Sequence, residues 1–226
     1  MDSVKIHMAS TLAGFILDAC FGDPHFLPHP VRGIGNLISL SEKGIRSLFP
    51  KTEKGELAGG ALFVLLVLGI TAALSFGLWY AAAAAGNTAL FLAESVMVYF
   101  LLAARSLRDE SMRVYYSLRN GDVEEARRNV SMIVGRDTSV LDAQGIARAA
   151  VETVAENASD GVIAPLFYLA LGGPVLGWVY KAVNTMDSMA GYKNKKYFWF
   201  GRAAARLDDA ANFLPSRLSA LLMIAA

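Results

Sequence analysis

Carboxylate and amide side chains stand at both ends of one apolar run, Val162–Val183. They are Glu152, Glu156, Asn157 and Asp160 before the run, and Asn184 and Asp187 after it. Oxygen atoms of these types bind divalent cations and, in carboxylates, transfer protons. If the run crosses a bilayer, the two groups lie on opposite sides. If the chain turns back within the run, they share one site.

A further acidic group lies beside basic residues closer to the C-terminus. Asp208, Asp209 and Asn212 fall within one helical turn, a spacing that suits the oxygen ligands of Mg²⁺. Mg²⁺ commonly takes one or two carboxylates together with substrate phosphates. Basic residues next to this turn offer contacts to such a phosphate: Lys193, Lys195, Lys196, Arg202 and Arg206. The segment therefore predicts a site for magnesium and phosphate.

Prolines bracket two histidines near the N-terminus. The segment 22–30 contains three prolines, which remove backbone donors and force the preceding residues out of helical conformation. Because the segment is extended, His25 and His29 do not share a helix face, and a two-histidine metal site is not expected. We interpret His29 as a substrate contact held by a rigid loop.

The elements that must position these residues belong to a membrane protein. Hydrophobic residues make up 54% and charged residues 18% of the 226 positions, against about 45–50% and 25% in soluble domains. No charged residue occurs from Leu57 to Ala93, well beyond the roughly 18 residues that indicate a transmembrane helix. The net charge of +1 is dispersed, which argues against a nucleic-acid partner. A single cysteine, Cys20, excludes an intrachain disulfide.

We predict an all-α, polytopic integral membrane protein with one transmembrane hairpin, a helical cytoplasmic segment and a re-entrant hairpin. The expected parts are a retained N-terminal helix at 1–21, an amphipathic surface helix at 31–49, the transmembrane hairpin at 57–104, cytoplasmic helices at 105–161, a re-entrant or kinked segment at 162–183, a polar site segment at 184–212, and the start of a further transmembrane helix at 213–226. Because the last apolar run is short, we expect the protein to continue beyond it.

Helix punctuation and periodicity give finer expectations. Asp122 with Glu125 predicts the start of a helix that reaches Val134, and Ser139 with Asp142 predicts the start of another that reaches Asn157. The buried stripe expected on the second of these helices is Ala147, Ala150, Val151 and Val154. Leu48 is placed on the buried face of the amphipathic helix with Ile34, Leu37, Ile38 and Ile45. Glu94 is either a functional carboxylate or an interface carboxylate with an arginine partner.

The distribution of lysine and arginine sets the expected topology. The segments 22–56, 105–161 and 181–212 contain five, eight and six of the 21 Lys and Arg residues, so all three are expected in the cytoplasm. Val162–Val183 must then return to the side it left, with a turn at Gly172-Gly173-Pro174. Each arm would have about 11 residues and span about 16 Å, half the hydrocarbon thickness. A proline-kinked spanning helix is the alternative.

Five motifs in order resemble the membrane-bound adenosylcobinamide-phosphate synthase family of cobalamin biosynthesis. They are Gly22-Asp23-Pro24 with Pro28-His29-Pro30-Val31; Gly135-Arg136-Asp137-Thr138; Val151–Asn157 with Asp160–Pro165; Asn184–Met189 with Gly191-Tyr192-Lys193; and Arg206-Leu207-Asp208-Asp209 with Asn212 and Pro215. No one of these short motifs is specific alone, but together they cover most of the chain.

The resemblance implies an ATP-dependent ligase that joins the carboxylate of adenosylcobyric acid to aminopropanol phosphate, or to aminopropanol, with Mg²⁺. On the chemistry of the residues, the metal ligands are expected to be Asp187, Asp208, Asp209 and Asn212. Substrate and phosphate contacts are expected from Asp23, Arg136, Asp137, Asn157, Asp160, Asn184, Lys193 and Arg206. Acid, base or second-ligand roles are expected for His29, Glu152 and Glu156. The expected location is the cell membrane, with the site facing the cytoplasm.

Two other interpretations stay open. A magnesium-dependent intramembrane transferase acting on diphosphate or nucleotide-activated substrates would use similar paired acidic motifs, but would need no separate ATP. A non-enzymatic corrinoid-binding or scaffold protein would use the carboxylates as helix caps and interface pairs. The chain has no glycine-rich phosphate loop, so the position of ATP is unexplained. The sequence also leaves a homo-oligomer open.

Overall fold

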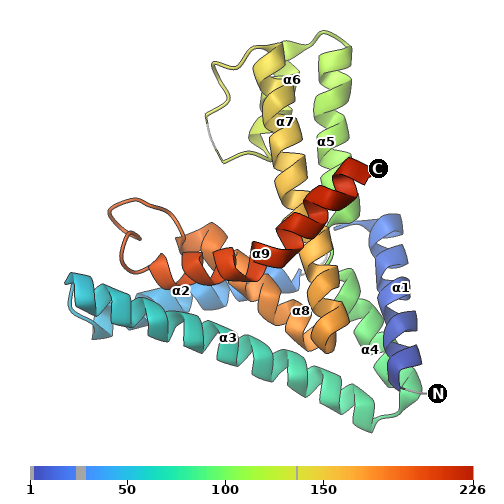
Figure 1. Cartoon of the computed structure of the whole chain (residues 1–226), viewed down its shortest axis with the longest axis vertical. Coiled ribbons are helices and arrows are strands. Elements are labelled where there is room, and N and C mark those ends of the chain that lie inside the picture. Colours follow the sequence, from blue (N-terminus) through green and yellow to red (C-terminus); the bar gives the residue numbers. More distant parts are fainter. Residues whose placement is uncertain (1–2, 24–28, 136, 226) are drawn as a thin grey trace.

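The computed structural model describes residues 3–23, 29–135 and 137–225, and throughout these ranges the regular structure is helical (Figure 1). The helices are α1 (Ser3–Phe21), α2 (Pro30–Leu48), α3 (Glu53–Ala84), α4 (Asn87–Tyr99), α5 (Ala104–Arg119), α6 (Val123–Ser131), α7 (Ala143–Ala158), the short π-helix η1 (Ser159–Ile163), α8 (Ala164–Ala190) and α9 (Arg202–Ala225). The predicted all-α class is confirmed. His25 and Arg136 lie outside the described residues.

Four helical stretches are long and apolar enough to cross a membrane: Ser3–Phe21, Glu53–Ala84, Asn87–Arg119 and Ala143–Ala190. The longest single helix, α3, has 32 residues and exposes large apolar side chains such as Leu65 and Leu74. Side chains of this kind on a helix surface are suited to contact with lipid. The chain is therefore a multi-pass membrane protein, as its composition indicates.

Side-chain caps explain where several helices begin. Asp122 accepts a hydrogen bond from Glu125 N at 2.8 Å and so starts α6, as predicted. Asp142 alone caps α7, through Gly145 N at 2.7 Å. The part of the prediction that gave Ser139 to this cap is wrong, because Ser139 N donates to Asp137 instead. Helix α6 also ends at Ser131, three residues before the predicted Val134.

The segment that follows α7 folds back on itself. Gly172 and Gly173 interrupt α8 with non-helical backbone angles, and Gly173 has a φ of 67°. Beyond the turn, Asn184 Nδ2 donates to Asp160 Oδ2 at 3.2 Å. One straight helix would separate these two residues by about 36 Å. The segment is therefore a hairpin, visible in Figure 1 where α8 reverses direction. The depth of this hairpin in a bilayer stays a prediction.

Two hydrophobic cores hold the helices together. The larger joins α2, α3, α4, α8 and α9, with Phe63, Met97 and Met186 among its buried side chains. The smaller joins α5, α6 and α7 through Val114, Ala126, Val130, Ile146 and Ala149. Figure 1 shows α5, α6 and α7 projecting together from the rest of the molecule.

The helix faces in these cores differ from two sequence-based predictions. On α7 the buried residues are Ile146, Ala149 and Thr153, whereas Val151 is 69% exposed. The predicted stripe is therefore rotated, because the smaller core meets α7 on the side of Ile146. On α2, Ile34, Ile38 and Ile45 are buried as predicted, but Leu48 is 75% exposed because it lies at the end of the helix.

Glu94 is buried in α4 beside a histidine rather than an arginine. Its carboxylate accepts a hydrogen bond from Trp79 Nε1 at 2.7 Å and lies 3.3 Å from His7 Nδ1. The other ring nitrogen of His7 donates to the Leu169 carbonyl at 3.0 Å. In an unbroken helix that carbonyl would accept from residue 173, where α8 is interrupted. The predicted arginine partner is wrong, and the His7–Glu94 pair supports the hairpin.

Candidate functional site

The hairpin brings the two polar ends of the apolar run together. Asp160, at the start of the hairpin, accepts from Asn184 on the returning arm. Tyr180, also on the returning arm, donates to Asn212 Oδ1 at 2.8 Å and so joins α9 to the group. Asn212 Nδ2 in turn donates to Asp208 Oδ2 at 3.0 Å. Segments that are far apart in the sequence thus meet around several carboxylates.

We call this group the acidic cluster. Its members are Glu156, Asp160, Asn184, Asp187, Asp208, Asp209 and Asn212. The charges of Glu156 and Asp208 act on both Asp160 and Asp187, and the charge of Asp209 acts on Asp187. The acidic groups predicted on either side of the apolar run and in α9 are therefore neighbours in the fold.

Asp208 shows the electrostatic cost of this arrangement. Burial, and then the nearby charge of Asp209, raise the pKa of Asp208, although hydrogen bonds from Asn212 and Asn184 oppose the rise. Its Oδ1 atom is buried and has no hydrogen-bond partner among the described residues. A buried carboxylate oxygen without a donor is unfavourable unless a cation or a donor meets it. The oxygen is therefore suited to a ligand.

The acidic cluster suits Mg²⁺ in one mode of binding. Within the described part of the chain, no group of three or more His, Cys, Asp or Glu side chains is close enough to hold a metal ion by itself. Mg²⁺ often binds through one or two carboxylates, waters and substrate phosphates. The bare oxygen of Asp208 fits that mode. A metal held here would share its coordination with substrate.

A basic pocket adjoins the acidic cluster at Asp209. It has a volume of about 310 Å³, and its lining includes Lys193, Arg202, Arg206 and Asp209. The turn that carries Lys193 is fastened to α2 through Glu42, which accepts from Lys196 Nζ at 2.9 Å and from Tyr197 at 3.1 Å. The predicted phosphate contacts Lys193 and Arg206 therefore lie together, on the side of Asp209.

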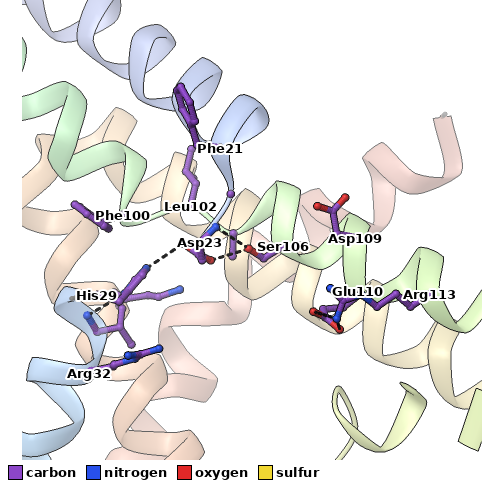
Figure 2. Close-up of a pocket in the computed structure, with 14 residues that line it drawn as sticks. Phe21, Asp23, His29, Arg32, Phe100, Leu102, Ser106, Asp109, Glu110 and Arg113 are labelled. Carbon is purple, nitrogen blue, oxygen red and sulfur yellow. Dashed lines mark hydrogen bonds and ion pairs between the residues drawn. The ribbon is translucent and has the colours of Figure 1, made fainter. Parts of the chain in front are cut away.

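The N-terminal motif forms a second polar centre. Figure 2 shows Asp23 between His29, the residue before α2, and Ser106 of α5. The Asp23 carboxylate lies 3.1 Å from His29 Nε2 and accepts from Ser106 Oγ at 2.8 Å. Burial raises the pKa of Asp23, but these hydrogen bonds and the charge of Lys181 outweigh it, and the net shift is downward. Asp23 is thus held as an ionised carboxylate.

His29 uses both ring nitrogens within the protein. Nδ1 accepts from Val31 N at 3.2 Å and caps α2, which leaves the ring proton on Nε2 for the hydrogen bond to Asp23. The edge of the His29 ring also packs against Phe100 at a centroid distance of 5.3 Å. The geometry gives His29 a positioning role. A direct role in acid–base chemistry stays a prediction.

Asp23 and His29 line a pocket of about 500 Å³, which we call the polar pocket (Figure 2). Lys181 of α8 also lines it, a residue that belongs to none of the sequence motifs. Its charge interacts with Asp23 of the polar pocket and with Asp160 of the acidic cluster, so Lys181 lies between the two. The available signal was a lysine within an otherwise apolar run.

Several predicted site residues are not brought to the acidic cluster. Asp137 precedes the 16-residue α7 whereas Asp160 follows it, which separates them by about 24 Å along that helix. Glu152 lies two turns before Asp160 and is not among the charges that act on Asp160 or Asp187. Asn157 donates to Thr153 O of its own helix. Arg136 is outside the described residues.

Comparisons with known proteins agree on one family. The family model described as CobD/Cbib protein matches residues 11–226. Similar curated proteins, each named cobalamin biosynthesis protein CobD, come from Geobacter metallireducens (50% identity over 95% of this chain and 66% of the relative), Photorhabdus laumondii (48% over 97% and 68%) and Listeria monocytogenes (48% over 95% and 67%). The chain thus spans about two thirds of their length. No solved structure matches it.

Proposed function

The chain belongs to the CobD/CbiB family of cobalamin biosynthesis proteins, and on that premise we propose that it is an ATP-dependent amide ligase. The proposed reaction joins the propionate carboxylate of adenosylcobyric acid to the amine of aminopropanol phosphate. We place the reaction on the cytoplasmic face of the membrane. The observation that carries the proposal is the acidic cluster, with a bare carboxylate oxygen on Asp208, beside a basic pocket that shares Asp209.

Amide formation from a carboxylate requires an activated acyl group. ATP transfers a phosphoryl group to the carboxylate oxygen, which gives an acyl phosphate and ADP. The amine nitrogen then attacks the acyl carbon, phosphate leaves, and the nitrogen loses a proton. The basic pocket is suited to bind the phosphates of ATP through Lys193 and Arg206. Mg²⁺ bound at Asp208 and Asp209 would supply charge neutralisation for those phosphates.

Two carboxylates were candidates for the base that removes the amine proton. Glu156 belongs to the acidic cluster, whereas Glu152 lies one turn further from it. We therefore assign to Glu156 the role of base or of second metal ligand. Asp160 and Asn184, which hydrogen-bond each other across the hairpin, would hold the two arms in position around the reacting groups.

The direct test is turnover in membranes that contain the protein. Adenosylcobyric acid, aminopropanol phosphate and Mg-ATP should yield the amide, with consumption of ATP in step with product. Product formed from an activated substrate without ATP would instead support the transferase interpretation. Corrinoid binding without any product would support the non-enzymatic one.

A further inference from the structure

Two cations of the polar pocket have no hydrogen-bond or ion-pair partner in the described part of the chain. Lys181 and Arg32 line it from α8 and α2, and neither forms a hydrogen bond or an ion pair with a described residue. Figure 2 shows Arg32 beside His29, on the α2 side of the pocket. Arginine and lysine carry up to five and three N–H donors, so most of the donors offered here await an acceptor.

Each carboxylate of the pocket, in contrast, already has a hydrogen-bonded partner. Asp23 lies between His29 and Ser106. Asp109 accepts from Arg105 Nε at 2.7 Å, and Glu110 accepts from Arg113 Nη1 at 3.0 Å. The charge left for a ligand is therefore positive. A small anion would meet free donors in this pocket, whereas a cation would compete with existing ion pairs.

Lys181 lies among carboxylates but forms no hydrogen bond with any described residue. It lies on the returning arm of the hairpin, and the charges of Asp18, Asp23 and Asp160 act on it. Burial disfavours the charged ammonium form of Lys181, whereas the nearby carboxylates and a bound anion favour it. Its position between the polar pocket and the acidic cluster means that a ligand it holds lies close to both.

We propose that the polar pocket binds the phosphate monoester of the amine substrate, with Lys181 and Arg32 as its contacts. This inference rests on the proposed function, and it separates two phosphate sites. The basic pocket next to Asp209 serves the phosphates of ATP, and the polar pocket serves the amine. A volume of about 500 Å³ accommodates a small phosphorylated amino alcohol. Lys181 and Arg32 would then bind the amine substrate for the ligase reaction.

Binding in the absence of ATP and corrinoid tests the pocket independently of turnover. The purified chain in lipid nanodiscs is titrated with aminopropanol phosphate and with aminopropanol, and binding is measured by calorimetry. The phosphorylated amine should bind, and the amine without phosphate should bind at least about tenfold more weakly. Arg32→Met and Lys181→Met should each weaken binding of the phosphorylated amine by about tenfold. Arg119→Met, at an exposed arginine outside the pocket, should leave it unchanged.

The outcomes separate the pocket from the reaction. Equal binding of the two amines, or wild-type affinity in Arg32→Met, overturns the pocket assignment even if amide is formed. Arg32 is exposed, so this variant is informative even where Lys181→Met fails to fold. In turnover assays Arg32→Met should raise the KM for the phosphorylated amine and leave the KM for ATP unchanged, and the reverse result also overturns the assignment. Phosphate-dependent binding without any turnover upholds the pocket and refutes the ligase.

Discussion

At the scale of single residues, Asp208 combines a carboxylate oxygen bonded by Asn212 with a buried oxygen that no described residue bonds. Asp208→Asn keeps the shape of the side chain but removes its charge. We expect this change to lower the rate of amide formation by about a hundredfold or more, because a metal–phosphate centre would lose a ligand. The measurement is product formation by membranes that contain equal amounts of inserted protein.

The matched control for this prediction is Glu125→Gln, which neutralises an exposed carboxylate on α6, a helix that contributes nothing to the acidic cluster. It should retain the full rate. An Asp208→Asn variant that turns over like wild type, at any Mg²⁺ concentration, would remove Asp208 from the proposed metal site.

Residue types and spacing predicted several members of the acidic cluster. They did not predict which residues of the same helix face are left out of it. Periodicity placed Glu152, Glu156 and Asp160 on one helix face. It tells which way these side chains point and not which of them meet another helix. How far along that face the cluster extends depends on where α8 and α9 pack, and of these residues Glu156 and Asp160 are the ones that interact electrostatically with Asp208 or Asp187. Lys181 was missed because tertiary packing, and no local pattern, brings it within electrostatic reach of Asp18 and Asp23.

At the scale of elements, Glu42 fastens α2 to the turn before α9. Burial raises the pKa of its carboxyl, but the partners Lys196, Tyr197 and Arg46 outweigh it and give a net lowering from 4.5. A lowered folded-state pKa means that the carboxylate stabilises the fold above its unfolded pKa, and that this contribution is lost as pH falls through the folded pKa. The ion pairs should therefore weaken only in acid, below about pH 4.5.

We expect Glu42→Gln to lower the Tm of the detergent-solubilised protein at pH 7. The gap between variant and wild type should shrink as pH falls from about 4.5 towards 3, because the wild-type carboxyl then becomes neutral as well. Thermal unfolding followed by circular dichroism across this range provides the measurement. A gap that stays constant with pH would show that Glu42 acts through packing and not through its charge.

The hairpin turn gives a second prediction at this scale. Gly173 has a φ of 67° and a ψ of −167°, a backbone conformation essentially confined to glycine, which costs another residue about 1–3 kcal/mol. Gly173→Ala should therefore reduce the free energy of unfolding by about that amount, and should lower activity because Asp160 and Asn184 would separate. Gly69→Ala provides the matched control, since this helical glycine of α3 has no atom within 4 Å of an added Cβ. Equal stability in the two variants would contradict the role given to the turn.

Local patterns predicted the helices well and their packing less well. The uncharged run and the Gly86 turn define α3 and α4, and Asp122 and Asp142 mark the starts of α6 and α7. The buried face of α7 was wrong because alanine and valine positions on two faces offer similar apolar stripes. Which stripe is buried depends on α5 and α6, so the information is tertiary.

At the scale of the whole molecule, the membrane topology can be tested from outside the site. The distribution of basic residues predicts that the acidic cluster and the segment 105–161 face the cytoplasm, and that the α3–α4 turn faces the other side. Single cysteines at Asn157, Ser188 and Asn87, each exposed, can report this after Cys20→Ser. An impermeant thiol reagent should label the first two from one face of the membrane and the third from the opposite face.

Labelling of Asn157→Cys and Ser188→Cys from opposite faces would contradict a re-entrant hairpin. The Asn87→Cys protein tests the reagent as well, because it should react only from the far side. Equal labelling of all three from one side would show that the reagent crosses the bilayer or that the vesicles are open.

The acidic cluster and the polar pocket differ in how far apart in the sequence their residues lie. The acidic cluster is built entirely from Glu156 to Asn212, whereas the polar pocket joins Asp23 and Ser106 to Lys181. Contacts between distant segments close larger loops and so cost more chain entropy. We expect the acidic cluster to be less sensitive than the polar pocket to changes in the segment that carries Asp23. A change that weakens docking of the N-terminal segment should therefore impair amine binding while sparing the acidic cluster.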